Sequence, residues 1–93
     1  MSYELSFSSK AKKDLKRYKG NKKKLEGLKK IIDLLAKGGL QAIPESNRPH
    51  KLIGNYSGCW ECHVMPDLLL IWEQYENPNH IVFIRIGSHS ELF

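Results

Sequence analysis

The feature of this sequence that most restricts its fold is a run of five apolar residues, Leu-Leu-Leu-Ile-Trp, at positions 68–72. Turn-forming residues bound the run on both sides, at Met65-Pro66-Asp67 and at positions 75–79 (Tyr-Glu-Asn-Pro-Asn). A strand whose side chains are apolar on both sides has to be covered on both faces. We therefore predict a buried central strand over Leu68–Gln74, and other parts of the chain must pack against both of its faces.

Two further strands flank this segment. The patterns of Cys59–Val64 and His80–Ile86 are both typical of strands, and together with the central segment they form two successive hairpins. At the start of the chain, Tyr3, Leu5 and Phe7 alternate with polar residues, which is the two-residue period of a half-buried strand. The sequence thus predicts a three-stranded meander that the N-terminal strand joins.

Between these strands the apolar period changes to that of helices. Ser8 or Ser9 provides an N-cap for a first helix that ends at Gly20, and a second helix starts near Asn21 and stops at Gly38-Gly39. The core-facing stripes are Ala11, Leu15 and Tyr18 in the first helix, and Leu25, Leu28, Ile32 and Leu35 in the second. A short Gly-Asn turn between them predicts an antiparallel helical hairpin.

The predicted fold class is α+β, with the order β-α-α-β-β-β. We expect two layers, an antiparallel sheet with the helical hairpin packed on one face. A loop marked by Pro44, Ser46, Asn47 and Pro49 returns the chain from the helices to the sheet. The 93 residues, 41% of them hydrophobic, suit one domain over residues 1–93 and are too few for two cores.

The charge of the chain is unevenly distributed. Fifteen Lys and Arg against ten Asp and Glu give a net charge of +5, and most lysines fall in the two predicted helices. Such a surface either faces a polyanion or is a solvated helical surface, and charge alone leaves both interpretations open.

We expect that this protein is not exported. Its first residues, Met-Ser-Tyr-Glu-Leu, lack the apolar region of a signal peptide, and no stretch approaches the roughly 20 apolar residues that span a bilayer. We expect a cytoplasmic protein with no membrane association. Cys59 and Cys62 are then expected to be free thiols.

A short motif over positions 59–63, Cys-Trp-Glu-Cys-His, matches the pattern of covalent haem attachment. Residues three apart in a strand point to opposite faces, so Cys59 and Cys62 do not converge on one metal ion, and haem attachment needs export. Buried structural cysteines explain the pair. We expect no cofactor and no metal.

The four histidines are more informative as a group than singly. His50, His63 and His89 each stand beside a residue that fixes the backbone, namely Gly54, Pro66 and Gly87, whereas His80 lies in a polar turn and looks incidental. Histidine is the side chain whose ordinary pKa suits proton transfer near neutral pH, although a single histidine is more often structural than catalytic.

These residues belong to three segments that resemble the YafQ branch of the RelE/ParE superfamily of bacterial toxins. The segments are His50-Lys51-Leu52-x-Gly54, then positions 61–71 (Glu-Cys-His-Val-x-Pro-Asp-Leu-Leu-Leu-Ile), then Arg85-x-Gly87-Ser88-His89-x-x-Leu92-Phe93. The resemblance covers nearly the whole chain and includes the predicted element order.

The resemblance implies an endoribonuclease that cuts mRNA in the ribosomal A site and is held silent by a cognate antitoxin. It places the catalytic positions on His50, His63, Asp67 and His89. It places an aromatic side chain near the RNA at Phe93. We expect further RNA contacts at Lys51, Trp60, Glu61 and Arg85. Relatives often have Arg where this chain has Trp60, so Arg85 or a lysine has to supply the cationic phosphate contact.

Metal-free RNA cleavage explains these residue types. It needs a base for the ribose 2′-OH, a group that stabilises the charge of the pentavalent phosphate, and an acid for the leaving 5′-oxygen. We place His63 and His50 on the 2′-OH side, with Asp67 orienting one of them or taking the proton, and His89 as general acid.

Two other classes of function remain open. A non-enzymatic, ParE-like toxin that poisons DNA gyrase shares the fold but generally lacks this histidine and aspartate set. A plain RNA-binding module is disfavoured by the shortage of aromatic stacking residues outside Trp60, Tyr56 and Phe93. Two roles are open for Phe93: its ring either stacks on a nucleobase or packs against the edge of the sheet.

Overall fold

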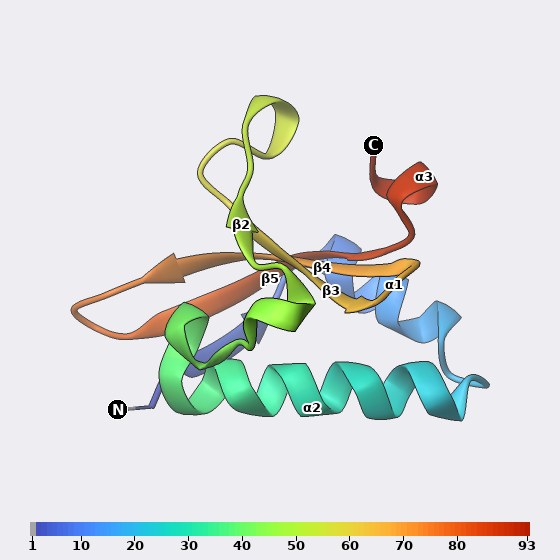
Figure 1. Ribbon diagram of the computed structural model, residues 1–93, viewed down its shortest axis with the longest axis horizontal. Coiled ribbons are helices and arrows are strands. Elements are labelled where there is room, and N and C mark those ends of the chain that lie inside the picture. The colour runs from blue at the N-terminus through green and yellow to red at the C-terminus, as the bar shows by residue number, and fades with distance from the viewer. Residues whose placement is uncertain (1) are drawn as a thin grey trace.

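The computed structural model describes residues 2–93 as one sheet with a long helix beneath it (Figure 1). Its strands are β1 (Glu4–Phe7), β2 (His50–Lys51), β3 (Trp60–Met65), β4 (Leu68–Tyr75) and β5 (His80–Gly87), and its helices are α1 (Ser9–Arg17), α2 (Lys22–Gly38) and α3 (His89–Leu92). Three short 3₁₀ turns, η1 (Gly39–Ala42), η2 (Glu45–Asn47) and η3 (Gly54–Tyr56), lie in the connections before and after β2.

The five strands lie in the order β1-β5-β4-β3-β2, so β4 is at the centre. Every side chain from Leu68 to Trp72 is at most 2% exposed. The prediction of a central strand covered on both faces is therefore confirmed. The two hairpins, β3–β4 and β4–β5, are also as predicted, with strand ends that differ by one residue.

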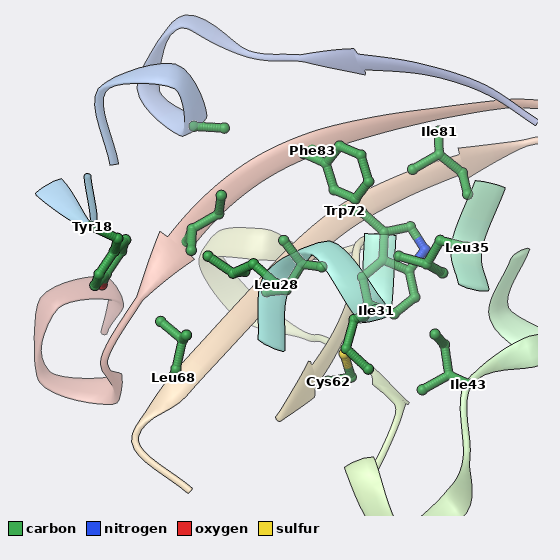
Figure 2. Close-up of a cluster of buried hydrophobic side chains, with 13 residues drawn as sticks. Tyr18, Leu28, Ile31, Leu35, Ile43, Cys62, Leu68, Trp72, Ile81 and Phe83 are labelled. Carbon is green, nitrogen blue, oxygen red and sulfur yellow. The ribbon is translucent and has the colours of Figure 1, made fainter. Parts of the chain in front are cut away.

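One face of the sheet packs against α1 and α2 and holds most of the core (Figure 2). Trp72 of β4 and Phe83 of β5 lie against Leu28 and Leu35 of α2, and Cys62 of β3 completes this layer. We call this surface the helix-covered face. Its buried members are Ala11, Tyr18, Leu28, Ile31, Leu35, Ile43, Cys62, Leu68, Leu70, Trp72, Ile81, Phe83 and Ile86.

The opposite face carries a much smaller cluster. Its buried members are Cys59, Leu69, Ile71 and Leu92, with Leu52, Tyr56 and Ile84 partly buried around them. Figure 1 shows that the segment from β2 through η3 and the C-terminal α3 rise on this side, away from the long helix α2. We call this surface the open face, because no long helix covers it.

The predicted helix ends are largely confirmed. Ser8 caps α1 by accepting a hydrogen bond from the Ala11 N–H, and Asn21 caps α2 in the same way from the Lys24 N–H. Gly39 ends α2 with a φ of 65°, and a Cβ there would come within 2.8 Å of the Gln74 side chain, so only glycine fits. The first helix ends at Arg17, earlier than the predicted Gly20.

The sheet is mixed, which corrects the expectation of an antiparallel one. Strand β1 pairs with β5 in parallel, Glu4 with His80 through Phe7 with Phe83. Parallel neighbours need a long connection, and the two helices and the meander together supply it. The pairing is fixed at its end by α1, because Ser8 donates its N–H to the Phe83 carbonyl and its hydroxyl to the Ile84 carbonyl.

Two elements lie outside the predicted set, namely β2 and α3. They contain two and four residues, which is too short for an apolar period to show in a sequence. Both flank the open face, so the elements that the sequence pattern missed are the ones that shape it. Among residues 2–93, no helix has the length and apolar character needed to cross a membrane.

Candidate functional site

Two rows of paired residues cross the open face and carry Glu61, His63 and Arg85 of the predicted site. In one row, Glu61 of β3 pairs with Ile71 of β4, which pairs with Arg85 of β5. In the next, His63 pairs with Leu69, which pairs with Gly87. Because neighbouring strands lie about 4.8 Å apart, His63 and the segment that leads from Gly87 into α3 are separated by roughly 10 Å.

His50 lies beside the first row. It pairs with Glu61 across β2 and β3, and its Nε2 atom is 3.1 Å from Glu61 Oε1. Its Nδ1 atom is 2.9 Å from the Arg48 carbonyl oxygen. The Glu61 side chain is 6% exposed, and its second oxygen, Oε2, is buried with no hydrogen-bond partner. A buried carboxylate thus holds an exposed histidine at the edge of the sheet.

His63 projects from the middle of β3 on the same face as Glu61, since residues two apart in a strand share a face. Its carbonyl accepts a hydrogen bond from the Asn47 side chain, and with Ser46 and Arg48 it lines a shallow pocket. Among residues 2–93, the His63 ring nitrogens have no hydrogen-bond partner. The ring is therefore free to exchange a proton with a ligand.

Arg48 is a candidate that the sequence analysis did not single out. It is exposed, lines the pocket beside His63 and makes no ion pair within residues 2–93. Its backbone lies in the left-handed region with a φ of 53°, which turns the chain so that its carbonyl meets the His50 ring. The only signal in the sequence is its place two residues before His50.

Helix α3 presents His89 and Phe93. Ser88 and Glu91 form a capping box: the Ser88 hydroxyl accepts from the Glu91 N–H, and the Glu91 carboxylate accepts from the Ser88 N–H. These hydrogen bonds lower the pKa of Glu91 below its ordinary value. The His89 ring stacks on Phe93 with centroids 5.0 Å apart, and both side chains are exposed.

Tyr56 ties this helix to the segment on the other side of the open face. Its hydroxyl donates to the Leu92 carbonyl at 3.1 Å, and its ring meets Phe93 edge to face at 5.4 Å. The position of His89 and Phe93 thus depends on a tyrosine from η3. The Phe93 ring packs against Tyr56 and His89 and is 52% exposed.

Asp67 lies apart from the histidines. It is exposed in the turn between β3 and β4, close enough to Tyr18 that its charge helps to raise the pKa of that phenol, which is raised mainly by burial. Within residues 2–93 it makes no hydrogen bond or ion pair with a histidine. The carboxylate that does contact a histidine is Glu61.

The remaining predicted RNA contacts are divided between the faces. Arg85 donates to the buried Asp14 of α1 at 2.7 and 3.2 Å, which raises the pKa of Arg85 and neutralises its charge. Trp60 packs against the core on the helix-covered face, and the Lys51 ammonium group lies 5.5 Å from the centre of its ring. Lys51 and Trp60 therefore lie on the face opposite Glu61 and His63.

The two cysteines lie on opposite faces, Cys62 in the main core and Cys59 in the open-face cluster. Burial raises the pKa of Cys62 to about 12 and also raises that of Cys59. Both are free thiols. In the part of the chain that the structure describes, no three His, Cys, Asp or Glu side chains lie close enough to hold a metal ion.

Comparison with known proteins decides the family. The model of the bacterial type II toxin–antitoxin toxin YafQ matches residues 3–93. The chain belongs to this family. The resemblance predicted from the three sequence segments is confirmed, and the chain is a toxin of the YafQ family.

Individual relatives agree over nearly full length. The mRNA interferase toxin YafQ of Escherichia coli K12 is 30% identical over 90 residues, which cover 97% of this chain and 95% of the relative. In the structure of the E. coli DinJ–YafQ toxin–antitoxin complex, the matching chain is 29% identical with a TM-score of 0.84, covering 100% of this chain and 99% of that one. A metal-bound toxin from Helicobacter pylori is 35% identical with a TM-score of 0.83 over the whole of both chains.

Proposed function

We propose that this YafQ-family toxin cuts mRNA in the ribosomal A site by acid–base catalysis that uses no metal, and that a cognate antitoxin silences it. That it is an endoribonuclease follows from its family, whose curated relatives bear the name mRNA interferase. The observation that carries the mechanism is the row His63–Leu69–Gly87, which sets His63 and the start of α3 on two sides of one apolar residue.

The two proton transfers of the cleavage reaction are divided between His63 on β3 and His89 on α3. His63 takes the proton of the 2′-OH, and the 2′-oxygen attacks the adjacent phosphorus. The bond from phosphorus to the 5′-oxygen breaks, and His89 gives that oxygen its proton, leaving a 2′,3′-cyclic phosphate. Both rings have unbonded nitrogens within residues 2–93, as a base and an acid require. A nucleotide is large enough to bridge the roughly 10 Å between the two elements.

The aromatic side chains of α3 suit a flexible, single-stranded substrate. Phe93 is exposed beside His89, and unstacked RNA bases bind to aromatic rings of this kind. Asp67 is exposed in the β3–β4 turn, and we assign it to orient or deprotonate a substrate group when RNA is bound.

The lysines of α1 and α2 provide the ribosome contact. They lie away from the open face, so rRNA phosphates can be held there while mRNA occupies the site. Ribosome and mRNA as substrates imply a cytoplasmic protein. The E. coli relative forms a complex with the antitoxin DinJ, and a cognate antitoxin of this kind is the partner we propose for this chain.

The test is cleavage of mRNA on programmed ribosomes by single variants. His63→Ala and His89→Ala should each lower the rate about 10²–10⁴-fold, which is the usual contribution of one proton-transfer group. The control is His80→Ala, because His80 bonds Ser6 at the distant β1–β5 edge and should leave the rate unchanged.

Three results would count against the proposal. They are wild-type cleavage by both site variants, loss of cleavage by wild-type toxin that was treated with a chelator and dialysed before it is added to the ribosomes, and inhibition of gyrase supercoiling in place of mRNA cleavage. The last would favour the non-enzymatic toxin class.

A further inference from the structure

We infer that Arg17, the last residue of α1, is a positioning residue for the proposed cleavage, because it binds the Glu91 carboxylate and so holds the C-terminal helix α3 in place. This helix presents His89 and Phe93 at the open face. The consequence for RNA cleavage rests on the proposed function, in which His89 protonates the leaving oxygen. The position of α3 itself can be tested on the protein alone.

Helix α3 needs support from outside because it is very short. It has four residues, and isolated helices of fewer than about 12 residues are marginal in water. Leu92 anchors its end in the small open-face cluster, and the Leu92 carbonyl accepts the hydrogen bond from Tyr56. His89 and Ser90, at the start of the helix, are exposed. A helix held at one end by packing requires a further contact to fix its direction.

The Glu91 carboxylate supplies this contact through its two oxygens. Oε1 accepts a hydrogen bond from the Ser88 N–H at 2.8 Å and closes the capping box. Oε2 accepts a hydrogen bond from Arg17 Nη1 at 3.2 Å. The hydrogen bonds from Ser88, with a smaller contribution from the charge of Arg17, lower the pKa of Glu91, so the carboxylate is ionised at neutral pH. One side chain therefore joins the first turn of α3 to α1.

The end of α1 is a firm support for this contact. Asp14, one turn before Arg17, is buried and accepts hydrogen bonds from the Arg85 side chain and from the Ile86 N–H of β5. Tyr18, directly after Arg17, is buried in the main core. The chain on both sides of Arg17 is thus fixed to the rest of the fold, and the Arg17 side chain extends this attachment to α3.

The Arg17–Glu91 pair is exposed, which limits its strength. The two side chains are 54% and 41% exposed, and a pair of this kind shifts an equilibrium by roughly two- to fivefold. A reaction rate is more sensitive to geometry than stability is, because displacement of a catalytic group by about 1 Å can lower the rate about 10²-fold. A modest restriction of α3 is therefore of greater consequence for His89 than for the fold.

Amide hydrogen exchange tests the position of α3 directly. The Leu92 and Phe93 amides donate hydrogen bonds to the carbonyl groups at the start of this helix. In Arg17→Gln their protection factors should fall roughly two- to fivefold, the range expected of an exposed ion pair. Lys16→Gln is the matched control, since it removes the same charge from the same exposed turn of α1 and should leave these protection factors unchanged. Equal protection in the two variants would overturn the inference.

Salt provides a second test that needs no substitution in the wild type. Raising the ionic strength from about 0.1 M to about 1 M shortens the screening length from about 10 Å to about 3 Å. The protection factors of α3 in the wild type should then fall toward those of Arg17→Gln, while Arg17→Gln itself should respond little. The same response to salt in both proteins would show that the Arg17 charge does not hold α3.

Cleavage on programmed ribosomes tests the consequence for the reaction. Arg17→Gln and Lys16→Gln each remove a positive charge that can contact rRNA, so both should raise KM. Arg17→Gln alone should also lower kcat, by about fivefold, because His89 is less well oriented. Arg17→Lys should recover most of this loss, since it keeps the charge. Equal kcat values for Arg17→Gln and Lys16→Gln would overturn the positioning role.

Glu91→Gln identifies the partner of Arg17. Glutamine keeps an oxygen that accepts from the Ser88 N–H, but it lacks the charge that binds the guanidinium. In the Glu91→Gln background, Arg17→Gln should therefore cause no further fall in kcat or in the protection of α3, and independent effects would overturn the inference. Absence of cleavage by the wild-type protein would instead contradict the proposed function, and hydrogen exchange would then decide whether Arg17 holds α3.

Discussion

The helix-covered face and the open face of this sheet are built from alternate residues of the same strands, yet they differ in almost every property. On the first, Trp72 and Phe83 are sealed beneath α2. On the second, a small cluster around Leu69 and Ile71 is covered only by the β2–η3 segment and by α3. The half-buried His63 and the exposed His89 both lie on the open face.

This difference shows how a domain of 93 residues accommodates both a core and a site. The buried area that stabilises the fold is mostly on one side, where side chains are apolar and hydrogen-bonded backbone is enclosed. The other side can then carry rings with unbonded nitrogens and a buried carboxylate without removing the main source of stability. The comparison predicts that stability and cleavage respond to substitutions on different faces.

The largest effect is expected from Trp72→Ala. Removing this fully buried ring from the helix-covered face should lower the free energy of unfolding by about 3–5 kcal/mol, through lost burial and the cavity left behind. Urea denaturation measures it. The matched control is Ile53→Ala, an 88% exposed side chain near the open face, which should change stability by less than about 0.5 kcal/mol. Equal effects would abolish the distinction between the faces.

Asp14→Ala should come next. Asp14 is buried and accepts hydrogen bonds from the Arg85 side chain and from the Ile86 N–H. It therefore holds α1 against the end of β5 that extends beyond its pairing with β1. Its loss should destabilise the fold by about 3 kcal/mol because it leaves a partly buried guanidinium unpaired. The exposed Asp33 of α2 provides the control variant, Asp33→Ala, and thermal melting measures both. A melting temperature equal to that of the control would show that the pair contributes nothing.

Ser88→Ala should have a smaller effect that is confined to the open face. Loss of the cap should lower the free energy of unfolding by about 1 kcal/mol. The rate of mRNA cleavage should fall as well, because His89 and Phe93 are no longer held in a fixed position. Hydrogen exchange of the Glu91 and Leu92 amides measures the loosening directly. If exchange there is unchanged, the capping box does not hold α3.

The same helix end should respond to acid. The hydrogen bonds from Ser88 lower the pKa of Glu91, so the carboxylate favours the folded state while it is ionised. That contribution is fully present above the ordinary glutamate pKa and is lost as the pH falls through the lowered value. The protection factors of the α3 amides, which compare observed with intrinsic exchange rates at each pH, should fall on acidification over this range, and Glu91→Gln should show no such pH dependence.

The smallest effect is expected for the cysteines. Burial raises the pKa of Cys62 to about 12, so its thiol is uncharged at neutral pH and shielded on the helix-covered face. Cys59, whose pKa is raised as well, should react faster because it lies under the thinner cover of the open face. Mass spectrometry after alkylation of the native protein measures the order, and faster labelling of Cys62 would reverse it.

Much of the fold could be predicted because apolar residues recur at regular spacings in its long helices and strands. The run from Leu68 to Trp72, the stripes of the two long helices and the caps at Ser8 and Asn21 all appear in the structure near their predicted places. The parallel direction of β1 could not be predicted, since a strand pattern is the same in either direction and the choice depends on where α1 packs. The short elements β2 and α3 lacked enough residues for a pattern.

For the site, the residue types identified the candidates, and the contacts in the structure showed which of them lie on the same face. His50, His63 and His89 do lie around one face, but Lys51 and Trp60 face the other side, Arg85 is neutralised by Asp14, and Asp67 stands apart in a turn. Arg48 and Tyr56 gained a role only through their positions beside His63 and Phe93. No sequence pattern states which carboxylate meets which histidine, because those partners are brought together by pairing of distant strands.

The sequence by itself determined the class of fold, the central strand, the two long helices and the family, because each depends on local periods or on motifs that are read along the chain. The tertiary structure alone decided which face of the sheet would stay open, and that Glu61 would lie buried behind His50. Both depend on strand register and on side-chain packing between segments far apart in the chain, where one residue of shift would move every side chain to the opposite face.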